Sequence, residues 1–93
     1  MARFNMEAAE AAGMIPAQAS GEAYYELGMM YASGRAVQTD LVAAHKWFNI
    51  AVARGVARGY RPAVERRAEL AQEMSAAEIA AAQREARLWL MRH

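Results

Sequence analysis

The chain of 93 residues is long enough for one domain, and its alanine-rich hydrophobic content of 56% favours close helix packing over a thick core. The absence of Cys excludes disulfides and thiolate metal sites, and 11 basic and 10 acidic residues mixed along the chain argue against a nucleic-acid-binding surface. No apolar run approaches the ~18–20 residues of a membrane span, and the first residues lack the apolar stretch of a secretion signal, so we expect a cytoplasmic protein without a membrane partner.

The first predicted helix spans residues 3–13, where helix-forming residues recur at helical spacing. Gly13 suits the end of this helix, and Ile15-Pro16 then favours an extended backbone. We expect the helix to pack as a cap on the helices that follow. The alternative is an arm that exchanges with a second copy of the chain.

Residues 21–33 are predicted to form a helix with one apolar face. That face consists of Ala23, Leu27, Met30 and Tyr31. Gly28 lies in the middle of the helix, where it costs about 1 kcal/mol relative to Ala. We therefore expect another backbone or a Trp ring to approach Gly28 closely. Gly34 is predicted to end the helix in the left-handed conformation.

A loop over 35–40 and a helix over 41–54 complete a helical hairpin that ends at Gly55. Val37 is the apolar residue of the loop and is expected to be buried under the hairpin. Asp40 is expected to cap the free amides at the start of the second helix. One face of that helix alternates small and large apolar residues, namely Ala44, Trp47, Phe48 and Ala51.

Residues 57–92 are predicted to hold a C-terminal pair of helices, from Pro62 to about Met74 and from Ala76 to about Arg92. Ser75 and Glu78 form a capping box between them. The buried face of the first helix is predicted at Val64, Ala68 and Ala71, flanked by Leu70 and Met74. That of the second is predicted at Ile79, Ala82, Ala86, Trp89 and Leu90. Residues 1–93 are therefore expected to form a single all-α domain.

Residues 23–55 also carry a set of short motifs in register. The first helix has Ala, Leu-Gly and Tyr, the loop has Gly, an apolar residue and Asp, and the second helix has Ala, Trp-Phe, Ala and a closing Gly. These residues are Ala23, Leu27, Gly28, Tyr31, Gly34, Val37, Asp40, Ala44, Trp47, Phe48, Ala51 and Gly55. In this pattern the stretch resembles one full repeat of the Sel-1-like family, a helical-hairpin solenoid related to tetratricopeptide arrays.

The resemblance implies a short α-solenoid-like hairpin with flanking helices, in which the matched residues are structural. It also implies a scaffold or adaptor role in protein–protein interaction and carries no catalytic residues. The sequence departs from the family pattern at Ala36, where the loop has a second Gly, and at Val52, where a closing pair has its second Ala. No second Leu-Gly motif follows Gly55, so the chain holds one repeat and not an array.

No constellation of residues predicts an enzyme, a metal site or a cofactor. His45 and His93 are remote in the sequence, and His45 is expected to be exposed or to lie beside a groove. Glu65, Glu69 and Glu73 recur at i, i+4 spacing among arginines. This pattern favours a solvated, salt-bridged face over a catalytic pair of carboxylates.

A single repeat leaves apolar faces uncovered, because such hairpins are normally stable in stacks of at least about three. We therefore expect a homo-oligomer, with a dimer favoured, or docking on a protein partner of unknown identity. The residues predicted for self-association are Phe4, Trp89, Leu90 and Met91, which would otherwise leave apolar area in water.

The face of the first hairpin helix opposite its apolar side is predicted to bind a partner. Its residues are Glu22, Tyr25, Glu26, Met29 and Ser33. Met and Tyr suit adaptable binding surfaces. The alternative is that Tyr25 and Met29 pack on the N-terminal or C-terminal helices. The predicted function is a non-catalytic interaction module, and the alternative function is a structural subunit that only self-associates.

Overall fold

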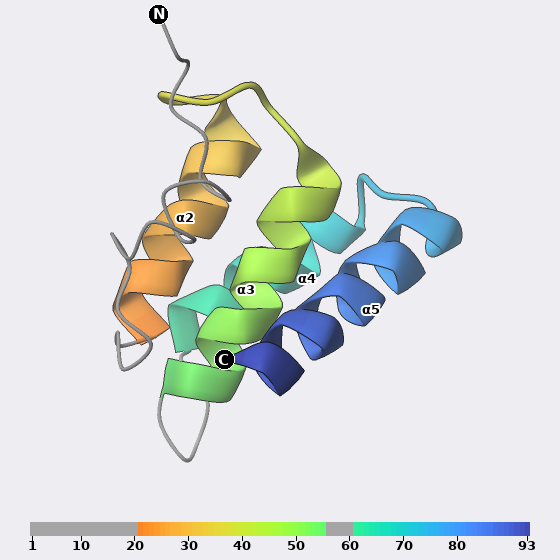
Figure 1. The fold of residues 1–93 in the computed structure, drawn as a ribbon. Helices are drawn as coiled ribbons and strands as arrows, with labels where there is room; N and C mark the ends of the chain where they lie inside the picture. The colour runs from red at the N-terminus through yellow and green to blue at the C-terminus, as the bar shows by residue number, and fades with distance from the viewer. Residues whose placement is uncertain (1–20, 56–60) are drawn as a thin grey trace, which may run out of the picture.

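The computed structural model describes residues 21–55 and 61–93, which form the helices α2 (Gly21–Ser33), α3 (Leu41–Gly55), α4 (Arg61–Ala71) and α5 (Ala76–Arg92). These two ranges contain no strand, so the predicted all-α fold class is confirmed. The predicted helix over 3–13, with Phe4, lies outside the described residues. Figure 1 shows α3 in the middle of the molecule, with α2 on one side, α5 on the other and α4 behind it.

α3 is the central helix because it packs against each of the other three. Its predicted apolar face is buried as expected, at Ala44, Trp47, Phe48 and Ala51. Three further residues of α3 that the sequence did not indicate are also buried: Ile50, His45 and Lys46. An amphipathic pattern predicts cover on one side of a helix, whereas α3 has neighbours on several sides. The Nζ atom of Lys46 lies 4.6 Å from the centre of the Trp47 ring, so a cation–π contact offsets part of its burial.

Three aromatic rings join α2, α3 and α5 in the core. Trp47 stacks on Tyr24 with ring centroids 5.9 Å apart. Trp89 meets both rings nearly edge-on, 5.3 Å from Tyr24 and 5.5 Å from Trp47. Offset and edge-on pairs of this kind contribute about 0.5–1.5 kcal/mol each beyond their area burial. The burial predicted for Trp89 is confirmed. Its predicted place on a self-association surface is wrong, because the Trp89 side chain is packed against the Tyr24 and Trp47 rings.

The buried face of α2 is turned slightly from the predicted one. The structure buries Gly21, Tyr24, Leu27 and Gly28. The predicted burial of Leu27 is therefore confirmed, whereas the other three residues of the predicted face are only half-buried, namely Ala23, Met30 and Tyr31. The reason is the Tyr24 ring, which fills the space beside the two Trp rings with far more apolar area than the Ala23 methyl could.

Two glycines allow α2 to approach α3 closely. A Cβ atom at Gly28 would overlap the Phe48 ring and lie 2.5 Å from its Cδ1 atom. The expected close neighbour of Gly28 is thus present, and it is a Phe ring rather than a Trp ring. A Cβ atom at Gly21 would overlap the backbone of Gly55 and lie 2.7 Å from the carbonyl oxygen of Ala51. Backbone meets backbone there, so α2 begins directly against the end of α3.

The loop between α2 and α3 forms as the sequence predicts. Gly34 has a φ of 77°, and the amides of Gly34 and Arg35 both donate to the carbonyl oxygen of Met30, at 2.8 and 3.1 Å. Val37 is buried. The Asp40 carboxylate accepts a hydrogen bond of 3.0 Å from the amide of Ala43, which caps the start of α3.

Ala36 is held in the left-handed region, with a φ of 68°. A side chain at such a φ costs about 1–2 kcal/mol. We expect Ala36→Gly to raise the free energy of unfolding by about 0.5–1 kcal/mol, because the relief of strain exceeds the extra entropy of glycine in the unfolded chain. Urea denaturation measures this difference. As a matched control, Ala80→Gly at an exposed position within α5 should lower stability by about 1 kcal/mol. A similar loss for both variants would contradict the prediction.

The buried face of α4 differs from the predicted one. α4 buries Ala63 and Leu70, whereas Val64 is 38% exposed and Ala68 is exposed as well. Since α4 packs mainly on α3, one narrow stripe of it is covered, and its short apolar residues elsewhere face solvent. The regular helix ends at Ala71, and amides 72–74 then donate to the carbonyl oxygens three residues earlier, which forms a tighter turn than the predicted helix to Met74.

The turn leads into α5 through the predicted capping box. The Glu78 amide donates to Ser75 Oγ at 3.0 Å, and the Ser75 amide donates to Glu78 Oε1 at 2.8 Å. The predicted buried face of α5 is confirmed for Ala82, Ala86 and Trp89, and Ile79 and Leu90 are half-buried.

Candidate functional site: the groove between α2 and α4

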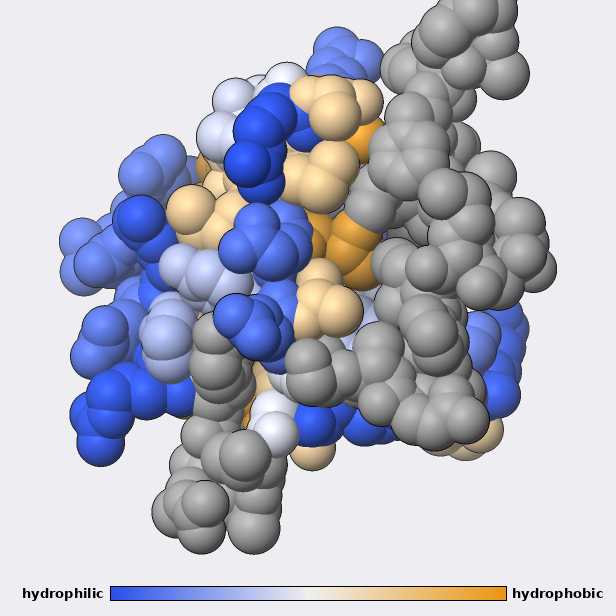
Figure 2. Space-filling view, turned by 90° about the vertical axis from the view of Figure 1, so that its left-hand side faces the viewer, coloured by the Kyte–Doolittle hydropathy of each residue, from blue (hydrophilic) through white to orange (hydrophobic). Residues whose placement is uncertain are grey.

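A groove of about 320 Å³ lies between α2 and α4, with α3 beneath it. α2 and α4 both pack on α3 but touch each other little, which leaves this space open. Figure 2 shows the α2 side of the molecule, where apolar side chains gather between polar ones. The groove is lined from α2 by Met29, Ala32 and Ser33, from α3 by Leu41 and Phe48, and from the α4 side by Arg66, Glu69, Leu70 and Glu73. Apolar lining with a few polar groups is the usual composition of a binding site.

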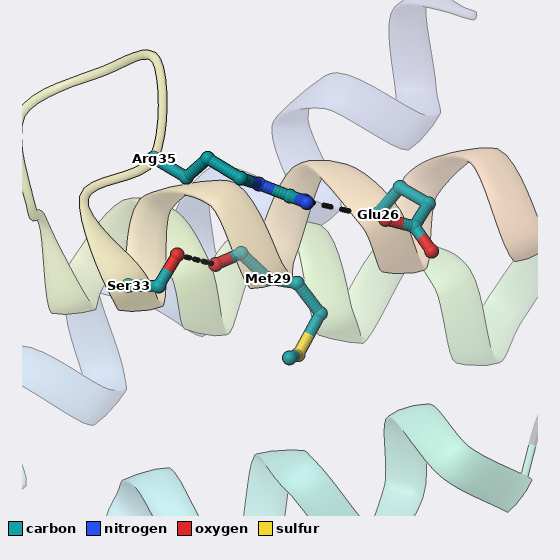
Figure 3. A network of polar contacts seen from close by, with 4 residues as sticks. All are labelled: Glu26, Met29, Ser33 and Arg35. Carbon is teal, nitrogen blue, oxygen red and sulfur yellow. Dashed lines mark hydrogen bonds and ion pairs between the residues drawn. The ribbon is translucent and has the colours of Figure 1, made fainter.

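The α2 wall of the groove contains two residues of the predicted partner-binding face. The Ser33 hydroxyl donates a hydrogen bond of 2.9 Å to the carbonyl oxygen of Met29, so it is used within the helix. Figure 3 shows the Met29 side chain extending from α2 toward α4 and away from Arg35. Met29 is half-buried. Its flexible thioether chain can therefore adapt to what enters the groove.

Glu26 lies on the outer side of α2. Its carboxylate pairs with the Arg35 guanidinium at 3.4 Å, as Figure 3 shows. The two side chains are 59% and 62% exposed, so this ion pair contributes at most about 1 kcal/mol. Glu22 is exposed and, like Glu26, does not line the groove. Glu22 and Glu26, two of the five residues of the predicted partner-binding face, therefore lie outside the groove.

Tyr25 connects α2 to both of the other groove helices. Its ring centroid is 5.8 Å from that of Phe48 on α3, and its hydroxyl is hydrogen-bonded to the Arg66 guanidinium on α4. Tyr25 is half-buried. The face that carries Tyr25 and Met29 is thus partly packed and partly open, which combines elements of both sequence-based alternatives.

The α4 wall carries the charges of the groove, and the sequence did not indicate it as a binding surface. Arg66 Nη1 pairs with Glu69 Oε1 at 3.0 Å. The hydrogen bond with Tyr25, followed by the pairing with Glu69, raises the pKa of Arg66 above its ordinary value. Glu73 has no ion-pair partner among the described residues. The predicted salt-bridged face is therefore present at Arg66 and Glu69, and the Glu73 carboxylate beside it has no counter-charge within residues 21–55 and 61–93.

A second polar cluster lies away from the groove, where α3 meets α4. Arg67 Nη1 donates to Asn49 Oδ1 at 2.8 Å, and Asn49 Nδ2 lies 2.9 Å from His45 Nδ1. Because a guanidinium only donates, Asn49 must present its oxygen to Arg67 and its NH₂ group to His45, whose Nδ1 then accepts. His45 is 2% exposed, which corrects the prediction of an exposed or groove-side histidine.

The buried His45 makes stability depend on pH. Burial, followed by the positive charge of Arg67, lowers the pKa of His45 below its ordinary value of 6.5. The unfolded chain therefore binds more protons between that lowered pKa and 6.5. The contribution of neutral His45 to the free energy of unfolding is therefore fully present above this window, and we expect it to fall as the pH decreases through the window. Urea denaturation between about pH 7 and pH 5 measures the effect. His45→Gln, which keeps an acceptor for Asn49 but does not titrate, should have a flatter profile, and equal slopes for the two proteins would refute the assignment.

The described residues contain no group of three or more His, Asp or Glu side chains placed to hold a metal ion. Nor does any helix within 21–55 or 61–93 combine the length and the apolar character needed to cross a membrane. No family model, curated protein or solved structure matches the chain.

Proposed function

We propose that the protein is a non-catalytic protein–protein interaction module of adaptor type, built on a single Sel-1-like helical hairpin and able to self-associate. The roles of the motif residues support the hairpin assignment. Leu27, Gly28, Val37 and the four matched residues of α3 before Gly55 are buried, Gly34 turns the chain, and Asp40 caps α3. The lack of Cys is compatible with work in a reducing cytoplasm.

The groove between α2 and α4 is the observation that carries the interaction role. Its apolar residues, among them Met29, Phe48 and Leu70, are accompanied by charged groups on one wall. Grooves of this kind between helices bind apolar side chains of a partner segment, and polar groups at the edge fix its orientation. At about 320 Å³ the groove has room for a few side chains rather than for a whole helix. We therefore expect recognition of a short apolar anchor.

The polar groups of the groove support binding over chemistry. The Ser33 hydroxyl donates to a backbone carbonyl, and Arg66 is held by Tyr25 and Glu69. No general base lies within hydrogen-bond distance of Ser33 among the groove contacts of the described residues. The groove therefore offers a shape and a charge pattern to a partner.

Site-specific photo-crosslinking tests the role of the groove. A benzophenone amino acid replaces Ser33 in the groove or, as the control, Glu65, which is exposed on α4 and does not line the groove. We expect the groove position alone to crosslink, in the native cell, to one defined peptide of another protein. That peptide must then bind the purified chain, and Met29→Glu should weaken its binding by at least tenfold.

The other outcomes separate the alternatives. Equal crosslinking at both positions, or none at the groove position, would overturn the groove as the interaction site. Crosslinks from the groove only to the same protein would support the second candidate function, a structural subunit that only self-associates. The exposed apolar residues of α5 are the observation that favours this second candidate.

A further inference from the structure

The outer face of α5 carries the clearest unpaired apolar feature of the described residues. Only three large apolar side chains of these residues are exposed, and two of them, Leu88 at 46% and Met91 at 81%, lie one turn apart on α5. The third, Val64, lies alone on α4. Leu88 was not among the predicted self-association residues, and it replaces the buried Trp89 in that role.

Basic residues flank the exposed apolar pair. Arg84 and Arg92 lie one turn before and one turn after Leu88 and are exposed, and neither forms an ion pair within the described part of the chain. Glu85, also exposed, is the one carboxylate within a turn of Leu88, so the basic groups outnumber it. α5 therefore has apolar side chains on two sides, one buried and one exposed. Its inner side packs on α3 through Ala82, Ala86 and Trp89, and its outer side presents an apolar pair between two guanidinium groups.

The groove between α2 and α4 is complementary to this outer face of α5 in polarity and charge. Its lining combines apolar side chains with two carboxylates, of which Glu69 is paired with Arg66 and Glu73 has no counter-charge among the described residues. The groove thus suits an apolar anchor with a positive charge beside it.

We infer that the groove of one copy receives Leu88 and Met91 from α5 of a second copy, with Glu73 of the first copy facing the arginines of the second. This inference rests on the proposed role of the groove as a protein-docking site. The two surfaces share no residue, so the contact joins unlike faces of two copies. The contact is small, so we expect self-association to be weak and dependent on concentration and salt.

Charge reversal with rescue tests the contact. Sedimentation velocity over a range of concentrations gives the association of the wild type, of Glu73→Arg and of the pair Arg84→Glu/Arg92→Glu. We expect each variant alone to associate at least tenfold more weakly than the wild type, and an equimolar mixture of the two variants to recover the association. The double variant Leu88→Ser/Met91→Ser should also lose it. Glu65→Arg, on α4 outside the groove, is the matched control and should associate as the wild type does.

All of these substitutions lie at exposed positions, and equal melting temperatures exclude unfolding as the cause of any loss. A wild-type chain that is monomeric at every concentration would overturn the inference, as would variants that associate normally or a mixture that shows no recovery. In any of these cases the proposed adaptor role of the groove stands if the groove still crosslinks to another protein, so the two failures are distinguishable.

Discussion

Trp47→Ala is expected to remove a large part of the stability of the domain. Trp47 is fully buried, stacks on Tyr24 and meets Trp89 edge-on, so its removal leaves a cavity at the point where three helices meet. Replacing a buried Trp by Ala costs about 3–5 kcal/mol. A chain of this length has a total stability on the order of 5–15 kcal/mol. Thermal and urea denaturation followed by circular dichroism should show either no transition or one shifted far below that of the wild type.

Met91→Ala is the matched control, because Met91 is 81% exposed and its truncation should change stability by less than about 0.5 kcal/mol. A Trp47→Ala variant with a transition close to that of the wild type would show that the aromatic cluster is not the centre of the fold.

Gly28→Ala is expected to lower the free energy of unfolding by about 1–3 kcal/mol. At an exposed position within a helix, the same substitution would raise stability by about 1 kcal/mol. The sign is reversed here because the added methyl group would overlap the Phe48 ring. Phe48 also lines the groove, so the ring cannot move without changing the groove. Urea denaturation measures the loss.

A double-mutant cycle with Phe48→Leu identifies the cause of that loss. If the Phe48 ring is the obstacle, Gly28→Ala should cost much less in the Phe48→Leu background than in the wild type. Additive effects of the two substitutions, or a gain in stability from Gly28→Ala alone, would contradict the close approach of α2 and α3 at this point.

Local signals in the sequence were sufficient to predict the four described helices, apart from the end of α4. Gly34, Asp40 and the Ser75–Glu78 capping box act through residues within a few positions of themselves, and each has the predicted role in the structure. The alternation of small and large residues on α3 also predicted its main buried face.

The errors concern features that depend on how the helices are placed in space. Val64 was predicted to be buried because its helix shows apolar spacing, yet α4 is covered along one stripe only. His45 lies on a polar-looking part of α3 that is covered once α3 is surrounded. The groove could not be predicted as a whole, because its α4 wall is brought opposite Met29 by tertiary packing and by no local pattern.

The sparse contact between α2 and α4 gives the groove a mechanical property. Each of the two helices is anchored on α3, and little joins them directly besides the hydrogen bond between Tyr25 and Arg66. We expect a small tilt of α4 to widen the groove, because the stacked rings come from α2, α3 and α5 and not from α4. We expect the α4 wall to move more readily than the aromatic centre, which would let one groove fit anchors of different size.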